Sequence, residues 1–213
     1  GIPHEMVGHY LVEDVPHEYI ASDPPGSGQL ALLPGSRTQE IERMLAPMLA
    51  AARTYLDRFG GRAVVAGIDG AHGYDTVLRQ AGEEISVSFE DSRRLLYESD
   101  LVLTASGTAT LEAGIIARPM VVIYKTGFIT YQIARRLVTL PMIALVNLVI
   151  GEKIVPELIQ HEASPERMAA ELAWYKEDDT YRENVLAALK RVAGILGGRG
   201  ASERAAKVVE GYL

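Results

Sequence analysis

Two short segments of small residues have the types and spacing that bind phosphate. The first is Gly35-Ser36-Arg37 and the second is Ser106-Gly107-Thr108, and each separates an apolar stretch from a helical pattern. Small residues at such a turn let a phosphate approach backbone N–H groups that the first turn of a helix leaves unpaired, and the helix dipole favours its negative charge. Both segments are therefore predicted to bind an anion. The alternative is that the serines and Thr108 only cap helices and that the glycines only form turns.

Two charged side chains extend this prediction. Arg37 offers a planar set of donors that suits phosphate oxygens, and Glu112, about one turn into the second helix, can accept hydrogen bonds from ribose hydroxyls. The alternatives are an exposed Arg37 that pairs with Glu40 or Glu42 and a Glu112 that is an ordinary exposed helix residue. Tyr124 and Lys125 end another buried stretch, which is where ligands contact a parallel sheet.

Buried strands that alternate with helices must position these segments. Apolar stretches predict strands at 30–33, 63–66, 85–89, 101–103 and 120–124. Helical patterns lie between them and predict helices at 41–59, 73–81, 92–99 and 129–138, and one more that follows the second turn and ends at 117. This alternation predicts an α/β fold with a Rossmann-like parallel sheet, helices on both faces and ligands at the carboxyl ends of the strands. Pro47 is expected to kink or divide its helix.

The chain is predicted to have three parts. Residues 1–28, rich in proline and glycine with short strand-like pieces at 6–8 and 10–12, are interpreted as a linker. Residues 29–163 form the Rossmann-like domain, and residues 164–213 are C-terminal helices. The pattern after Gly151 is wholly helical, with helices expected at 181–196 and 202–213, and Ser164 is a predicted N-cap with Pro165 at the first helical position. The opening residues, which lack an initiator methionine, are interpreted as the middle of a longer protein.

The composition narrows the classes of partner and location. The 213 residues are 48% hydrophobic with a formal charge of −7, which disfavours nucleic acid as a partner, and none is cysteine, so the cytoplasm is the expected compartment. The five histidines show no zinc-like spacing, and no metal or other cofactor is predicted. The longest apolar stretch, 137–150, is too short for a membrane span of ~20 residues.

Taken together, several strings resemble the lipid-A-disaccharide synthase family. They occur in the family's order and spacing: Leu32–Arg37 with Glu40-Ile41, Ala105–Glu112, Pro119–Val122 with Tyr124-Lys125, Ala134–Val138, Asn147-Leu148 with Gly151, and Val155–Leu158. The resemblance implies an inverting glycosyltransferase of the two-domain GT-B type that acts in lipid A biosynthesis. Such enzymes transfer 2,3-diacylglucosamine from UDP to 2,3-diacylglucosamine 1-phosphate (lipid X) and release UDP.

The resemblance covers only the C-terminal, donor-binding half of that fold. It implies that the general base lies on an N-terminal domain, that this chain supplies no catalytic residue and that it is inactive alone. The last helices are expected to cross back toward that domain, or, without it, to pair with a second copy of the chain or stay mobile. The implied substrate-binding residues are Gly35, Ser36, Arg37, Ser106, Gly107, Thr108, Glu112, Tyr124, Lys125 and Asn147, with the turn at 88–90 as a candidate contact for uracil. The alternative for Asn147 is a loop-forming role.

Lipid substrates also imply contact with a membrane surface. The segment 131–138 is apolar with adjacent arginines at 135 and 136, which suits a peripheral site on the cytoplasmic face of the inner membrane. An ordinary core helix with two outward arginines is the alternative. Rival functions are another GT-B enzyme, such as the N-acetylglucosaminyl transferase of peptidoglycan synthesis or a UDP-sugar 2-epimerase, and a non-catalytic nucleotide-sugar-binding module. The Pro-Gly-Ser-Arg string at 34–37 argues against these other GT-B enzymes.

Overall fold

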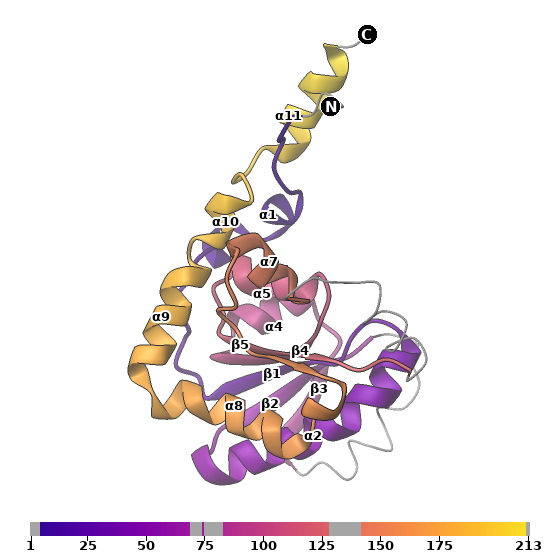
Figure 1. Cartoon of the computed structure of the whole chain (residues 1–213), viewed down its shortest axis with the longest axis vertical. Helices are drawn as coiled ribbons and strands as arrows, with labels where there is room; N and C mark the ends of the chain where they lie inside the picture. The colour runs from indigo at the N-terminus through magenta and orange to yellow at the C-terminus, as the bar shows by residue number, and fades with distance from the viewer. Residues whose placement is uncertain (1–4, 69–73, 75–82, 128–141, 212–213) are drawn as a thin grey trace.

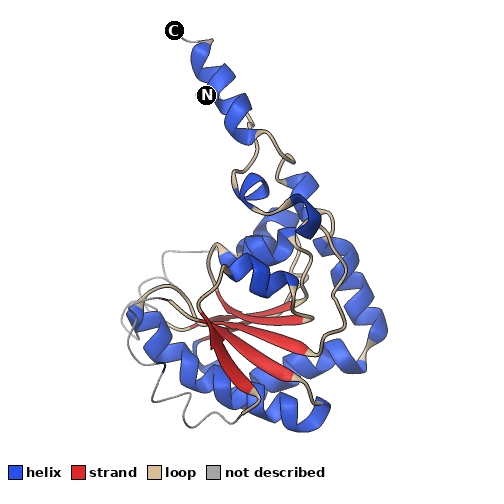
Figure 2. Ribbon diagram, turned by 180° about the vertical axis from the view of Figure 1, so that it is seen from behind, coloured by secondary structure: helices blue, strands red, loops and turns tan. Residues whose placement is uncertain are grey.

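The computed structural model describes residues 5–68, 74, 83–127 and 142–211, and its centre is a parallel β-sheet (Figures 1 and 2). The described residues form six strands in the order β3-β2-β1-β4-β5-β6, and every neighbouring pair is parallel. Their bounds are β1 Gln29–Leu33, β2 Arg62–Ala66, β3 Ile85–Ser88, β4 Leu101–Ala105, β5 Met120–Tyr124 and β6 Glu157–Ile159. The predicted Rossmann-like α/β fold is confirmed.

Helices cover both faces of the sheet. On one face α2 (Thr38–Phe59) packs against α8 (Pro165–Glu177), and on the other lie α4 (Ser92–Tyr97), α5 (Ala109–Ile115) and α7 (Leu145–Ile150) (Figure 1). The remaining helices are α1 (Leu11–Asp14), α9 (Asp179–Leu189), α10 (Val192–Ile195) and α11 (Ala201–Glu210), with 3₁₀ turns η1 (His17–Tyr19) and η2 (Gln160–Glu162). None of the described helices has the length and hydropathy needed to cross a membrane.

The helix α2 continues through Pro47, so of the two expected effects, a kink or a division, the division does not occur. Proline lacks an N–H, so its main local effect is to leave the carbonyl of Arg43 without its usual helical donor. The buried stripe continues on both sides of it, with Met44 and Met48 both at 2% exposure or less. Packing of that stripe on the sheet and on α8 maintains one helix of 22 residues.

Three other predictions need correction. The stretch after Gly151 is not wholly helical, because β6 adds a short edge strand that pairs with β5, and just before it the carbonyl of Pro156 accepts the N–H of Val122. Three residues are too few to show a strand pattern. The strand-like piece at 10–12 belongs to α1, and the expected helix at 181–196 is split into α9 and α10. Ser164 caps α8 as predicted, whereas the helices expected at 73–81 and 129–138 lie outside the described residues.

The segment before β1 lies beside the C-terminal helix (Figures 1 and 2). Ser202, at the start of α11, donates to the carboxylate of Glu13 from both its N–H and its hydroxyl, at 3.0 and 2.6 Å. The Arg204 guanidinium donates to the carbonyl of Val7, and Arg199 donates to that of Val15. These contacts pair the two segments away from the sheet.

A buried arginine fastens the segment before β1 to the body of the fold. Arg118 is fully buried, and its guanidinium donates to the carbonyls of Leu96, Tyr97, Ile116 and Ser22 and to the Ser22 hydroxyl, at 2.8–3.0 Å. Burial lowers the pKa of Arg118 to about 10, so the group is still protonated at neutral pH. One side chain therefore donates to four backbone carbonyls, two of which, those of Leu96 and Ile116, have a further donor in Ser99 and Ser22.

We predict that Arg118→Met destabilises the protein strongly. Methionine fills much of the space but leaves the carbonyls of Ser22 and Tyr97 without a donor, each at a cost of roughly 1–3 kcal/mol, and removes one donor from those of Leu96 and Ile116. Urea unfolding should show a loss of about 3 kcal/mol or more, whereas the exposed control Arg94→Met should change the stability little. Equal losses in the two variants would contradict this role for Arg118.

Candidate functional site

The two predicted phosphate-binding turns lie side by side because their strands are neighbours. β1 and β4 pair in parallel, with Leu33 opposite Thr104, so their following turns, residues 34–37 and 106–108, leave the same edge of the sheet. From there the chain continues into α2 on one face and into α5 on the other. This is the switch point of the sheet, where a crevice opens outside the carboxyl ends of the strands.

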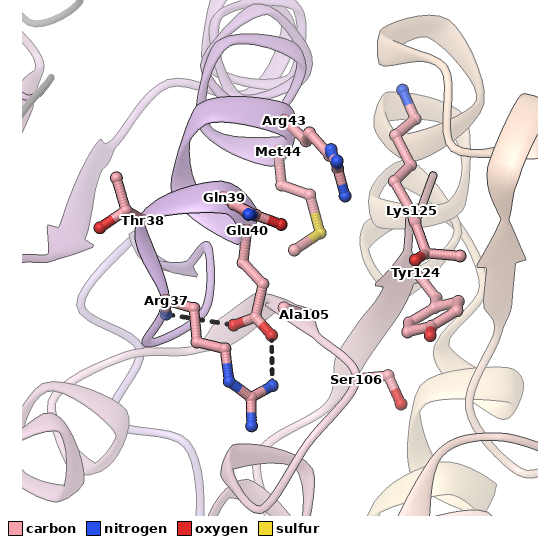
Figure 3. Close-up of a pocket in the computed structure, with 11 residues that line it drawn as sticks. Arg37, Thr38, Gln39, Glu40, Arg43, Met44, Ala105, Ser106, Tyr124 and Lys125 are labelled. Atoms are coloured by element: carbon pink, nitrogen blue, oxygen red, sulfur yellow. Dashed lines mark hydrogen bonds and ion pairs between the residues drawn. The ribbon is translucent and has the colours of Figure 1, made fainter. Parts of the chain in front are cut away.

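In the first turn the predicted anion seat is occupied by the chain's own Glu40 (Figure 3). One carboxylate oxygen accepts the backbone N–H groups of Ser36 and Arg37 at 3.1 and 3.3 Å, and the other accepts the Arg37 guanidinium at 2.9 Å. Gly35 has a φ of +110°, and a Cβ there would lie 2.4 Å from a carboxylate oxygen of Glu40. The alternative pairing of Arg37 with Glu40 is thus present, although the Arg37 side chain is 81% exposed and can leave it.

The second turn is open. No described residue accepts a hydrogen bond from the N–H groups of Gly107, Thr108 or Ala109. Thr108 is the N-cap of α5 without a side-chain cap bond, and the Ser106 hydroxyl donates to the carbonyl of Ile143 instead of facing a ligand. The backbone of this turn, rather than its hydroxyl groups, is therefore what is available to an anion.

A cavity of about 610 Å³ lies over both turns, and we call it the first cavity. It extends from the end of β1 past residues 66–68, which follow β2, to Glu90 and to Glu112 on α5. The residues that the sequence predicted and that line it are Gly35, Ser36, Arg37, Ser106, Gly107, Thr108 and Glu112. Of the turn proposed for uracil, Glu90 lines the cavity and Ser88 does not.

Glu112 is held in a half-buried ion pair. Its side chain is 14% exposed, and a carboxylate oxygen lies 3.5 Å from Nε of Arg93, which also lies 3.3 Å from Asp91. Burial raises the pKa of the Glu112 carboxyl, and the Arg93 guanidinium partly offsets this. Sequence reasoning missed Arg93, because the two residues meet only through the packing of α4 against α5.

A second cavity of about 490 Å³ adjoins the first between α2 and the end of β5 (Figure 3). Arg37, Glu40, Ala105 and Ser106 line both cavities. Tyr124 and Lys125, both predicted site residues, line only the second, together with Arg43 and Met44. The sequence analysis did not single out Arg43, which lies on the outward face of α2.

Asn147 lies apart from both cavities in a buried polar cluster. Its amide nitrogen donates to Glu157 at 2.8 Å and to the carbonyl of Val155, and its amide oxygen accepts the N–H groups of Ile154 and Val155. Glu157 also accepts the N–H groups of Ile143 and Ala144. These contacts favour the loop-forming alternative for Asn147: the cluster holds the chain beside Ser106, and Asn147 has no free group for a ligand.

No metal centre is evident in the part of the chain that the structure describes. Its His, Asp and Glu side chains nowhere gather in threes as ligands would. The donors near the two turns are backbone N–H groups and cationic side chains.

Comparison with known proteins identifies one family. The model of the lipid-A-disaccharide synthetase family matches residues 1–207. The chain is 38% identical over 225 residues to the lipid-A-disaccharide synthase of Anaeromyxobacter dehalogenans, covering 100% of this chain and 58% of that protein. The corresponding values for the synthase of Geobacter metallireducens are 35% identity, 98% and 57%. The chain thus spans less than three fifths of the length of these relatives.

Solved structures with low identity share the fold. The glycotransferase of kitacinnamycin superposes with a TM-score of 0.55 at 19% identity, covering 89% of this chain and 44% of that one. The pneumococcal O-GlcNAc transferase, solved in complex with UDP and GlcNAc, gives 0.55 at 16% identity, covering 90% and 37%. At these identities the likeness concerns the GT-B glycosyltransferase fold alone.

We predict that Glu40→Gln tightens the binding of inorganic pyrophosphate. The substitution removes a negative charge from the seat and releases Arg37; at about 4 Å in water one charge contributes ~1 kcal/mol, or about fivefold in Kd. Calorimetric titration at low ionic strength measures this. The control Glu42→Gln removes the same charge from an exposed position outside both cavities, and equal tightening in that variant would show only a general charge effect.

A second prediction concerns pH and Glu112. Because its pKa is raised in the folded protein, ionisation of Glu112 disfavours folding as the pH rises through that pKa, whereas Glu112→Gln cannot ionise. As the pH rises from about 4 to about 7, the free energy of unfolding of the Glu112→Gln variant should therefore increase relative to that of the parent. Urea unfolding at each pH tests this, and a difference that does not change with pH would contradict it.

Proposed function

The chain belongs to the lipid-A-disaccharide synthetase family, and on that premise we propose that it forms the donor-binding half of a glycosyltransferase. The reaction transfers 2,3-diacylglucosamine from UDP to 2,3-diacylglucosamine 1-phosphate, giving lipid A disaccharide 1-phosphate and UDP. Since the chain spans 57–58% of its relatives, we assign this reaction to the complete protein.

The observation that carries the proposal is the open backbone turn at 107–109 beside Arg37. Three N–H groups without a described acceptor at the switch point of a parallel sheet suit the diphosphate of a nucleotide sugar. Departure of UDP places additional negative charge on the β-phosphate, and preorganised donors stabilise that charge without a metal. Arg37 contributes when it exchanges Glu40 for a phosphate oxygen.

The nucleoside occupies the first cavity in this proposal. Glu112 lines this cavity, where its carboxylate accepts hydrogen bonds from the ribose hydroxyls, and its ion pair with Arg93 holds the carboxylate in place. Uracil then lies between residues 66–68 and Glu90, where backbone groups recognise it. The donor sugar follows the diphosphate toward Tyr124 in the second cavity. Asn147 is left out of the proposed site because its amide is fully used by protein groups.

The chemical step needs a group from outside this chain. The acceptor hydroxyl attacks the anomeric carbon as the bond to the β-phosphate oxygen breaks, which inverts the configuration. A carboxylate on the preceding half of the protein takes the hydroxyl proton. Residues 29–163 with the helices of 164–213 bind the donor, residues 1–28 connect to that half, and this chain alone does not turn over.

Both substrates are lipids, so we propose that the protein works at the cytoplasmic face of the inner membrane as a peripheral protein. Basic and apolar residues at 131–138 suit that contact by charge and hydropathy. This segment lies outside the described residues. Without the preceding half, the last helices of this chain are proposed to pair with a second copy.

The test is UDP binding and turnover by the complete protein. Arg37→Ala should weaken UDP binding by roughly tenfold, because it removes a charge-assisted hydrogen bond. The control Arg58→Ala, at the far end of α2 and paired with Glu177, should leave UDP binding unchanged. With both lipid substrates the complete protein should release UDP and form disaccharide. Absence of UDP binding to the parent protein would overturn the proposed site.

A further inference from the structure

The second cavity has an excess of positive charge. Its described lining includes three cationic side chains, Arg37, Arg43 and Lys125, against the single carboxylate of Glu40. Glu40 already accepts hydrogen bonds from Arg37 and from the backbone of its turn. The charges of Arg43 and Lys125 are therefore left over.

These two cations face one cavity from different elements. Arg43 projects from α2 and Lys125 follows β5, and Figure 3 shows them on opposite sides of the gap. Within residues 5–68, 74, 83–127 and 142–211 neither side chain has an ion-pair or hydrogen-bond partner, whereas other cations such as Arg58, Arg94 and Lys190 are paired. Two like charges that line one cavity without a counter-charge favour an anion between them.

The first cavity has the opposite balance. Its described lining includes the carboxylates of Glu40, Glu90 and Glu112 and only one cation, Arg37. Carboxylates suit the hydroxyl and N–H groups of a nucleoside, and the backbone turn between the cavities suits its diphosphate. Neither the nucleoside nor the diphosphate accounts for the two cations Arg43 and Lys125 in the second cavity.

We propose that Arg43 and Lys125 bind a second phosphate, the phosphomonoester of the acceptor, in the second cavity. This inference rests on the proposed function. The donor sugar, acylated on its nitrogen, has no ionised group, whereas the acceptor has a phosphate with about two negative charges at neutral pH. A cavity of about 490 Å³ is within the range of small-molecule sites. Met44 and the ring of Tyr124 add apolar surface for the face of a sugar.

The site makes Arg43 and Lys125 determinants of acceptor specificity. The guanidinium offers paired donors to the phosphate oxygens and the ammonium acts as a point charge, so both raise affinity for the phosphorylated sugar over its dephosphorylated form. They act beside the diphosphate seat and hold no part of the nucleoside. The acceptor is thereby held by its phosphate on the donor-binding half of the enzyme.

The test is steady-state kinetics of the complete protein with Arg43→Met, Lys125→Met and the double variant. Each single variant should raise the KM for 2,3-diacylglucosamine 1-phosphate by about tenfold, with the donor KM and the Kd for UDP changed less than about twofold. The control Lys176→Met removes a cation from α8, outside both cavities, and should change none of these. UDP binding by every variant also reports that the variant is folded.

A second arm varies the pH. The acceptor KM of the parent should fall as the phosphate loses its second proton near pH 6, and this dependence should weaken in the double variant. If the acceptor KM is unchanged in these variants, the inference is overturned, and Arg43 and Lys125 are solvated surface cations. A parallel rise in donor KM and UDP Kd also overturns it and assigns the cations to the donor diphosphate. Failure of the proposed function has a different signature, since the parent would then not bind UDP.

Discussion

The parallel pairing of β1 with β4 is the constraint on which the site depends. It aligns Leu33 with Thr104, so that the two turns of small residues emerge from one edge of the sheet. The chain then crosses to opposite faces, through α2 on one side and α5 on the other, because right-handed crossovers from two central strands proceed in opposite directions along the sheet. The turns are close in space, while the helices that begin at them diverge. The first cavity occupies the opening between these helix starts, and the second adjoins it between α2 and the end of β5.

The two cavities differ in charge: acidic side chains predominate in the first and basic side chains in the second. Glu40 stands at the shared wall and accepts hydrogen bonds from the donors of the first turn, which leaves only the second turn open to an external anion. A phosphate that approaches Arg37 therefore competes with a carboxylate already in place. In the proposed arrangement the acidic side receives the hydroxyl groups of a nucleoside, and the basic side receives phosphate. The distribution of charge thus separates the nucleoside of the donor from the phosphate of the acceptor.

Local signals in the sequence predicted most of the fold, and tertiary contacts account for what they missed. Buried strands such as β1 and β4 are continuous apolar stretches, and Ser164-Pro165 is a helix start that needs no other part of the chain. Nine of the ten predicted site residues line a cavity, since they follow strands. Asn147 does not, because its partners ten residues away become neighbours only once β6 joins the sheet. The three-residue spacing of Arg37 and Glu40 predicted their pairing as an alternative, but not that Glu40 also accepts the backbone N–H groups of Ser36 and Arg37, as the glutamate of a capping box accepts a backbone N–H.

The pairing of the N-terminal segment with the C-terminal helix has a mechanical consequence. Hydrogen bonds from Ser202 to Glu13 and from Arg204 to Val7 link two stretches of chain that reach the sheet at separate places. Arg118 anchors the first of these stretches at Ser22. An unpaired segment can twist freely about its single bonds. Twisting this pair of segments requires the hydrogen bonds between them to break. The two segments are therefore expected to move together, as one arm, rather than as two independent tethers.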